Sequence, residues 1–75
     1  MDIRQVFAAN LRRLRHARNL SQEALAHEAQ IDRTYVSALE RGVYSASLDT
    51  IANLADALGV EPYELLIKEN ASRRD

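Results

Sequence analysis

The chain has 75 residues and a formal net charge of −1, a length typical of one domain, since single domains fall mostly between about 50 and 250 residues. Its composition, 47% apolar and 28% charged, supports one modest core and excludes a disordered acidic or basic tail. No cysteine is present, which excludes a disulfide framework and a thiolate metal site.

The first predicted helix has one apolar face. Its apolar positions recur at spacings of four, four and three residues: Ile3, Phe7, Leu11 and Leu14. The other faces carry arginines, of which we expect Arg12 and Arg13 to lie in solvent. Asn19 is a residue type that favours the end of a helix.

Two short helices with a tight connection follow. Ser21 is the predicted N-cap of one and Asp32 of the other, because their side-chain oxygens can accept from backbone N–H groups of the first turn. Residues 30–31 form the connection, and Gly42 ends the second helix of the pair, since glycine tolerates the left-handed conformation. The expected inward residues are Leu25, Ala26, Ala29, Tyr35, Val36 and Leu39.

A fourth helix and a short fifth helix complete the predicted architecture. Ser47 is the expected N-cap of the fourth helix and Gly59 its end. The apolar positions of this helix are Leu48, Ile51, Leu54, Ala55 and Leu58. Pro62 fits the first position of the fifth helix, where its missing N–H costs nothing. No segment has a clear strand pattern, so we expect an all-α fold, a compact bundle of five helices.

The third helix combines a polar outer face with an apolar inner face. Arg33, Thr34 and Ser37 lie at positions i, i+1 and i+4, with Ala38 beside them. An α-helix fits the major groove of B-DNA, where all four base pairs show distinct donors and acceptors, so we interpret this helix as a DNA-reading element. Arg33 is the strongest candidate, because bidentate contact from arginine to guanine is worth about 1–3 kcal/mol of discrimination.

The charge distribution gives this interpretation slight support. Residues 1–41 carry seven arginines against five acidic residues, a net charge of +2. Residues 42–75 carry three basic against six acidic residues, a net charge of −3. The predicted reading helix therefore lies in the positive part of the chain, as a DNA-binding protein needs.

Residues 20–26 (LSQEALA) and 33–42 (RTYVSALERG) resemble the helix-turn-helix of the Cro/phage-repressor family, also called the xenobiotic response element family. Residues 47–52 (SLDTIA) and 57–60 (ALGV) are similar to its fourth-helix pattern, so the resemblance extends over residues 6–67. The resemblance implies a lambda-repressor-like DNA-binding domain that binds double-stranded DNA as a two-fold homodimer.

The same resemblance implies roles for particular side chains. The family's base-reading positions are held here by Arg33, Thr34, Ser37 and Ala38. Its phosphate-contacting positions are held by Gln22, Arg41, Val43, Tyr44 and Ser45. Two further candidates for phosphate contact are Ser21, through its hydroxyl, and Tyr35. Arg15 and Glu40 match a pair that links the first and third helices as an internal ion pair.

Three features depart from the family pattern. Gln30 stands where the turn usually has glycine or another small residue, so we expect it to adopt a positive φ at a cost of about 1–3 kcal/mol. The loop at residues 44–47 (YSAS) lacks the proline and asparagine that the family often has there. No lysine occurs in residues 1–41, which leaves phosphate binding to arginine and neutral donors.

Several of these residues also have a purely structural interpretation. Arg33 could be an exposed arginine at a helix start, although the helix dipole disfavours a cation there. Asp32 is predicted as a cap rather than a base reader, and Arg41 could neutralise the carbonyl end of its helix. The predicted dimer patch consists of Tyr63, Leu66 and Ile67. The alternative is that these three side chains complete the core of the monomer.

We expect a sequence-specific transcription regulator that binds a palindromic operator as a homodimer, with the third helix in the major groove. The DNA-binding domain would occupy residues 1–68, followed by a polar tail at 69–75. Its RTYVS run also resembles the controller proteins of restriction–modification systems. The alternative is a protein-interaction module, an antitoxin or adaptor, that uses the bundle to bind a partner protein.

No feature predicts an enzyme, a cofactor or a small-molecule ligand. His16 and His27 are eleven residues apart and lack the ligand pattern of a metal site. No nucleophile–base pair or phosphate-binding glycine loop occurs in the sequence. No apolar stretch approaches the about 18 residues of a membrane helix, and the start lacks the apolar core of a signal peptide, so we expect a cytoplasmic protein without a membrane partner.

Overall fold

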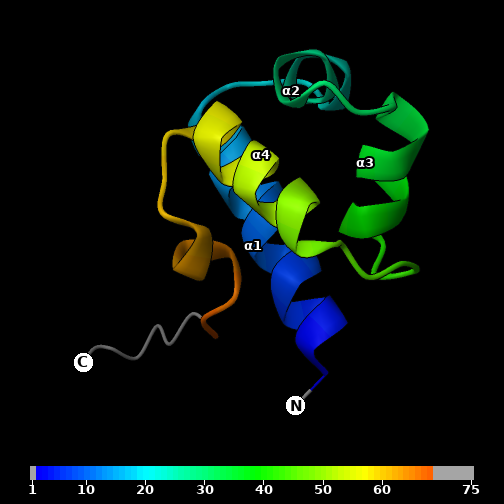
Figure 1. Ribbon diagram of the computed structural model, residues 1–75, viewed down its shortest axis with the longest axis vertical. Helices are drawn as coiled ribbons and strands as arrows, with labels where there is room; N and C mark the ends of the chain where they lie inside the picture. Colours follow the sequence, from blue (N-terminus) through cyan, green and yellow to red (C-terminus); the bar gives the residue numbers. More distant parts are fainter. Residues whose placement is uncertain (1, 69–75) are drawn as a thin grey trace.

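The computed structural model describes residues 2–68, which form four α-helices and then a short 3-10 helix (Figure 1). The elements are α1 (Ile3–Ala17), α2 (Gln22–Ala29), α3 (Arg33–Glu40), α4 (Leu48–Leu58) and η1 (Pro62–Leu65). No strand occurs in the described range, which confirms the predicted all-α fold. Within the same range, no helix is long and apolar enough to cross a membrane. The polar tail predicted at residues 69–75 lies outside the described residues.

The prediction of a fifth α-helix is wrong, because η1 is a 3-10 helix of four residues. Pro62 holds its first position as predicted. The Leu66 N–H donates to the carbonyl of Tyr63 at 2.9 Å, the i to i+3 pattern of a 3-10 helix. The carbonyls of Leu65 and Ile67 accept hydrogen bonds from Asn10 of α1, so tertiary contacts hold the end of this segment.

The predicted N-caps of α2, α3 and α4 are confirmed. Side-chain oxygens of Ser21, Asp32 and Ser47 accept from backbone N–H groups of the first turn at 2.9, 2.8 and 3.1 Å. A cap of this kind typically stabilises a helix by about 1 kcal/mol. Gly42 and Gly59 follow α3 and α4 with φ of +74° and +72°, so both helices end in the left-handed conformation as expected.

The core gathers side chains from every element. Its fully buried residues include Leu11, Leu25, Val36, Leu39, Leu54, Leu58 and Leu65. Helix α2 packs against α3 and α4, whereas α1 packs against both α3 and η1. In Figure 1, α3 lies on one side of α1 and α4, and η1 lies on the other. Helix α1 therefore connects the two sides of the molecule.

Leu48 does not join this core, contrary to the prediction from its spacing. Its side chain is 82% exposed, whereas Ile51 and Leu54 farther along α4 are buried. Leu48 holds the first position of α4, and side chains on a helix lean toward its N-terminus. The side chain therefore points past the end of the core. The spacing identified the face of the helix correctly but not the point at which the core ends.

Candidate nucleic-acid interface

The connection between α2 and α3 is a tight left-handed turn. Gln30 has a φ of +60°, which confirms the positive φ expected at this position. The N–H of Ile31 donates to the carbonyl of Ala26 at 3.0 Å and closes the end of α2. Asp32 then begins α3 immediately as its N-cap. The two helices thus form a compact helix-turn-helix with the start of α3 facing solvent.

Arg33 is exposed at the first position of α3. Its guanidinium makes no hydrogen bond or salt bridge to another residue in the range 2–68. The neighbouring Asp32 carboxylate supplies a nearby negative charge, but the five guanidinium N–H donors stay available. This side chain is therefore ready to bind an external acceptor.

Thr34 directs its hydroxyl back toward the cap. Its Oγ1 donates to Oδ1 of Asp32 at 2.5 Å, and the same oxygen accepts the Thr34 backbone N–H at 2.8 Å. These bonds, the hydroxyl bond first, hold the pKa of Asp32 below its usual value. Because the single hydroxyl hydrogen of Thr34 is used within the protein, Thr34 offers an external ligand its methyl group and oxygen lone pairs rather than a donor.

Ser37 and Ala38 lie on different parts of α3. Ser37 is half-buried, and its carbonyl accepts from Nε of Arg41 at 3.3 Å. Ala38 is only 4% exposed and belongs to the core. The expectation that Ala38 shares the outer face is corrected on this point, because its side chain is buried. The candidate reading surface therefore consists of Arg33, Thr34 and part of Ser37.

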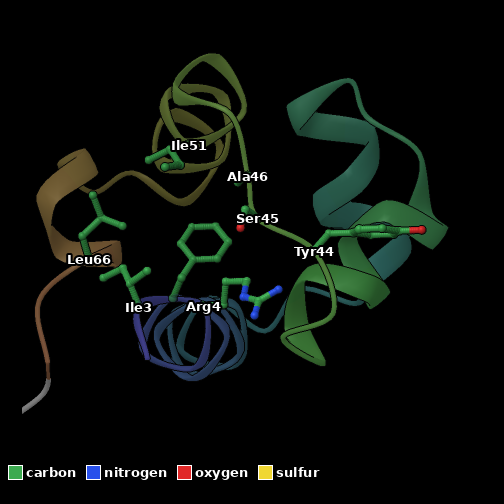
Figure 2. A pocket seen from close by; sticks show the side chains of 8 residues that line it. Ile3, Arg4, Tyr44, Ser45, Ala46, Ile51 and Leu66 are labelled. Carbon is green, nitrogen blue, oxygen red and sulfur yellow. The ribbon is translucent and has the colours of Figure 1, made fainter. Parts of the chain in front are cut away.

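The residues predicted to contact phosphates differ in their exposure. Ser21, Arg41 and the loop residues Val43, Tyr44 and Ser45 are exposed, whereas Gln22 and Tyr35 are half-buried. The oxygen of Ser21 accepts a backbone hydrogen bond, which leaves its hydroxyl hydrogen free to donate. Figure 2 shows the phenol ring of Tyr44 directed away from Ile51 and Leu66 and toward the side of α3.

A buried ion pair holds α3 against α1 from behind. Arg15 donates from Nε and Nη2 to the two carboxylate oxygens of Glu40 at 2.6 and 3.0 Å, which confirms the predicted pair. The hydrogen bond to Glu40 raises the pKa of Arg15, so its guanidinium stays charged. Gln22 of α2 donates to Glu40 at 3.1 Å, and this contact links all three helices at one carboxylate.

Arg12 and Asn10 make polar contacts that were not predicted from the sequence. Arg12 is exposed as expected, but its guanidinium also donates to the backbone carbonyl of Glu40. The sequence feature that could have predicted this contact is the position of Arg12 three residues before Arg15, which places both side chains on one face of α1. Asn10 is 2% exposed and donates to backbone carbonyls next to η1. The sequence feature that could have predicted these bonds is the presence of a polar residue, Asn10, on the apolar face of the first helix.

The predicted dimer patch lies on the side of the molecule away from α3 (Figure 1). Tyr63 is 61% and Ile67 50% exposed, whereas Leu66 is half-buried. Leu66 borders a small apolar hollow of about 90 Å³ that Ile3 and Ile51 also line (Figure 2). The patch therefore remains accessible and does not simply complete the monomer core. Among residues 2–68, no group of three or more His, Cys, Asp or Glu side chains is arranged to hold a metal ion.

Known proteins share both this sequence pattern and this geometry. The helix-turn-helix family pattern matches residues 11–65. The control protein C.BamHI of Bacillus amyloliquefaciens is 46% identical over 66 residues, which cover 87% of this chain and 82% of that protein. The crystal structure of the restriction–modification controller protein C.AhdI from Aeromonas hydrophila is 48% identical, with a TM-score of 0.81 over 83% of this chain and 94% of that one.

A third relative extends the likeness over nearly the whole chain. The crystal structure of the hypothetical transcription factor NHTF from Neisseria is 42% identical, with a TM-score of 0.91 over 97% of this chain and 84% of that one. The chain belongs to the helix-turn-helix family, and its class is that of DNA-binding transcription regulators.

Proposed function

We propose that this chain regulates transcription by binding a palindromic operator as a homodimer, with α3 in the major groove. The observation that carries the proposal is the first turn of α3, where Arg33 is exposed and makes no hydrogen bond within residues 2–68. A free guanidinium at the start of an exposed helix suits bidentate contact with a guanine. Thr34 beside it would contribute its methyl group to a thymine or accept from a base donor.

Rigid support of α3 favours this use. Base reading requires side chains held in one position, and the Arg15–Glu40 pair fixes the far end of α3 to α1. Exposed donors around the reading surface, from Ser21 and Arg41, would then contact phosphates and set the register on the duplex. The further residues that we propose to contact the sugar-phosphate backbone of the DNA are Gln22, Tyr35, Val43, Tyr44 and Ser45.

The homodimer is proposed from the patch on the opposite side of the molecule. Tyr63 and Ile67 expose apolar surface beside Leu66. A two-fold pairing through this patch would leave both copies of α3 uncovered, because η1 and α3 lie on opposite sides of α1 and α4 (Figure 1). Helix-turn-helix dimers of this kind read half-sites about 34 Å apart, one turn of the DNA helix.

The test is selection of bound oligonucleotides from a random pool by the full chain. We expect an enriched inverted repeat, and an affinity that falls steeply between about 50 and 200 mM salt as phosphate counterions are displaced. Enrichment of a single half-site without a repeat would contradict the homodimer. No DNA binding at the low-salt end would contradict the whole proposal and favour the protein-interaction alternative.

Within this class, we propose a restriction–modification controller role. The similarity to C.BamHI and C.AhdI, at 46% and 48% identity, supports it. The measurement is transcription of the genes that flank the chain's own gene, at several concentrations of the chain. We expect a restriction or modification gene among those that respond. A response confined to other genes would contradict this narrower role and leave the DNA-binding proposal standing.

A further inference from the structure

A buried asparagine joins α1 to the chain that follows α4. Asn10 is 2% exposed. Its Nδ2 donates to the backbone carbonyls of Leu65 and Ile67 at 2.9 and 2.8 Å, and its Oδ1 accepts from Nη2 of Arg13 at 3.3 Å. An asparagine amide has two donor hydrogens, so both are used on this one segment. A polar side chain on the apolar face of α1 thus directs both of its donors to the C-terminal segment.

The segment at residues 62–67 depends on contacts of this kind because it is too short to hold its own shape. The fully buried side chain of Leu65 and the half-buried side chain of Leu66 pack it against the core. Apolar contacts are not directional, so they hold the segment in place but fix its rotation only loosely. The two hydrogen bonds from Asn10 reach the carbonyls on either side of Leu66, and so they fix this rotation.

The rotation decides which side chains face outward. In the present orientation Tyr63 and Ile67 are exposed, while Leu66 turns half inward against Ile3 and Ile51. We infer that Asn10 is the positioning residue that holds this segment in the orientation that a second copy of the chain binds. The inference rests on the proposed homodimer and names the residue outside the interface on which that interface depends.

The test replaces the amide of Asn10 with a carboxyl group, which has a hydrogen to donate only when it is protonated. The full chain carrying Asn10→Asp presents a carboxylate with no hydrogen to donate at pH 8, and a protonated acid with one donor at low pH. Burial beside two carbonyl oxygens favours the protonated form. The charged groups that share the surface around Asn10 are Arg13 and Lys68, whose positive charges favour the carboxylate and act against this effect of burial. The pH dependence of the variant is therefore compared directly with that of the unchanged chain.

Sedimentation equilibrium and hydrogen exchange give the two readouts. At pH 8 we expect the dimer dissociation constant of Asn10→Asp to rise at least tenfold over that of the unchanged chain. The amides of Leu66 and Ile67, which donate to the Tyr63 carbonyl at 2.9 and 3.1 Å, should exchange faster. At pH 5 we expect part of the lost affinity to return. A role confined to general stability would lower the melting temperature and leave the dimer dissociation constant of the folded chain unchanged.

Two further variants serve as controls. Asn53→Asp makes the same chemical change on an exposed face of α4 and should dimerise like the unchanged chain at both pH values. Asn10→Leu has no donor at any pH, so its dimer should weaken at pH 8 without recovery at pH 5. Native dimerisation and native exchange in both Asn10 variants at pH 8 would overturn the inference.

The outcome also separates this inference from the proposed function. An unchanged chain that binds its selected DNA but stays monomeric would refute the homodimer, and the interface role of Asn10 with it. Exchange at Leu66 and Ile67 would then still decide whether Asn10 holds the segment. An unchanged chain that dimerises but selects no DNA would refute the operator proposal, and the Asn10 variants would remain a full test of the dimer.

Discussion

Arg15 on α1 and Glu40 on α3 form a bidentate ion pair, at 2.6 and 3.0 Å, in which the Glu40 side chain is only 3% exposed. The same carboxylate accepts from Gln22 of α2. Breaking a buried pair by removing one partner leaves the other charge uncompensated, which is far more destabilising than loss of a surface pair. The position of α3 relative to the rest of the fold therefore depends on this carboxylate as well as on the buried side chains of Val36 and Leu39.

Glu40→Ala is expected to lower the free energy of unfolding by about 3–5 kcal/mol, because the buried Arg15 guanidinium would keep its hydrogen bond to the Leu20 carbonyl but lose its counter-charge. Thermal and denaturant melting measure it. Glu28→Ala on the exposed face of α2 is the control and should shift stability by less than about 0.5 kcal/mol. Replacing both partners, with Arg15→Met and Glu40→Leu, should recover most of the loss, since no buried charge remains. A melting curve of Glu40→Ala identical to that of the unchanged chain would refute this assignment.

Gln30→Gly is expected to stabilise the chain slightly, by about 0.5 kcal/mol. Gln30 has a φ of +60°, and glycine removes the left-handed strain of about 1–2 kcal/mol while adding about 0.5–1 kcal/mol of unfolded-state entropy. The matched change Glu28→Gly, two residues earlier within α2, should instead destabilise by about 1 kcal/mol. Chemical denaturation of the two variants measures whether their free energies of unfolding change in opposite directions. Equal destabilisation by both would show that the turn is not strained.

Local chemistry was enough to predict the helix ends. Ser21, Asp32 and Ser47 cap their helices within two or three residues of chain, so their contacts can be inferred from neighbouring sequence alone. The positive φ at Gln30 could be expected in the same way, from its place in the family's turn. The Arg15–Glu40 pair crosses 25 residues, and only the family resemblance pointed to it.

The errors share a different cause. Whether Leu48 is buried depends on where the core ends, and whether residues 62–65 form an α-helix depends on what their carbonyls meet. Asn10 bonds to residues 55 and 57 positions away, a contact that no local pattern contains. These features follow from tertiary packing, which overrides local preference in short or terminal segments.

Asp32 makes the stability of α3 depend on pH in the acid range. Its pKa is lowered in the folded state, chiefly by the Thr34 hydroxyl, so it stabilises the fold above its unfolded pKa of about 3.9. That stabilisation is lost as the pH falls through the lower folded pKa. We expect the melting temperature of Asp32→Asn, which keeps a capping oxygen, to approach that of the unchanged chain as the pH is lowered below about 4. A difference between the two that stays constant from pH 6 to pH 2 would contradict this.

Arg33 and Arg41 lie at opposite ends of α3, and removing each should affect DNA binding differently. Arg33→Ala is expected to relax the preference at one base pair of the selected site, losing about 1–3 kcal/mol of discrimination there. Arg41→Ala, which removes the same charge from the C-cap, should weaken binding to all sequences alike and reduce the salt slope by about 1. Fluorescence anisotropy with the selected duplex and single-base variants measures both effects. Uniform weakening by Arg33→Ala would reassign this residue to phosphate contact, because a group that reads a base must discriminate among bases.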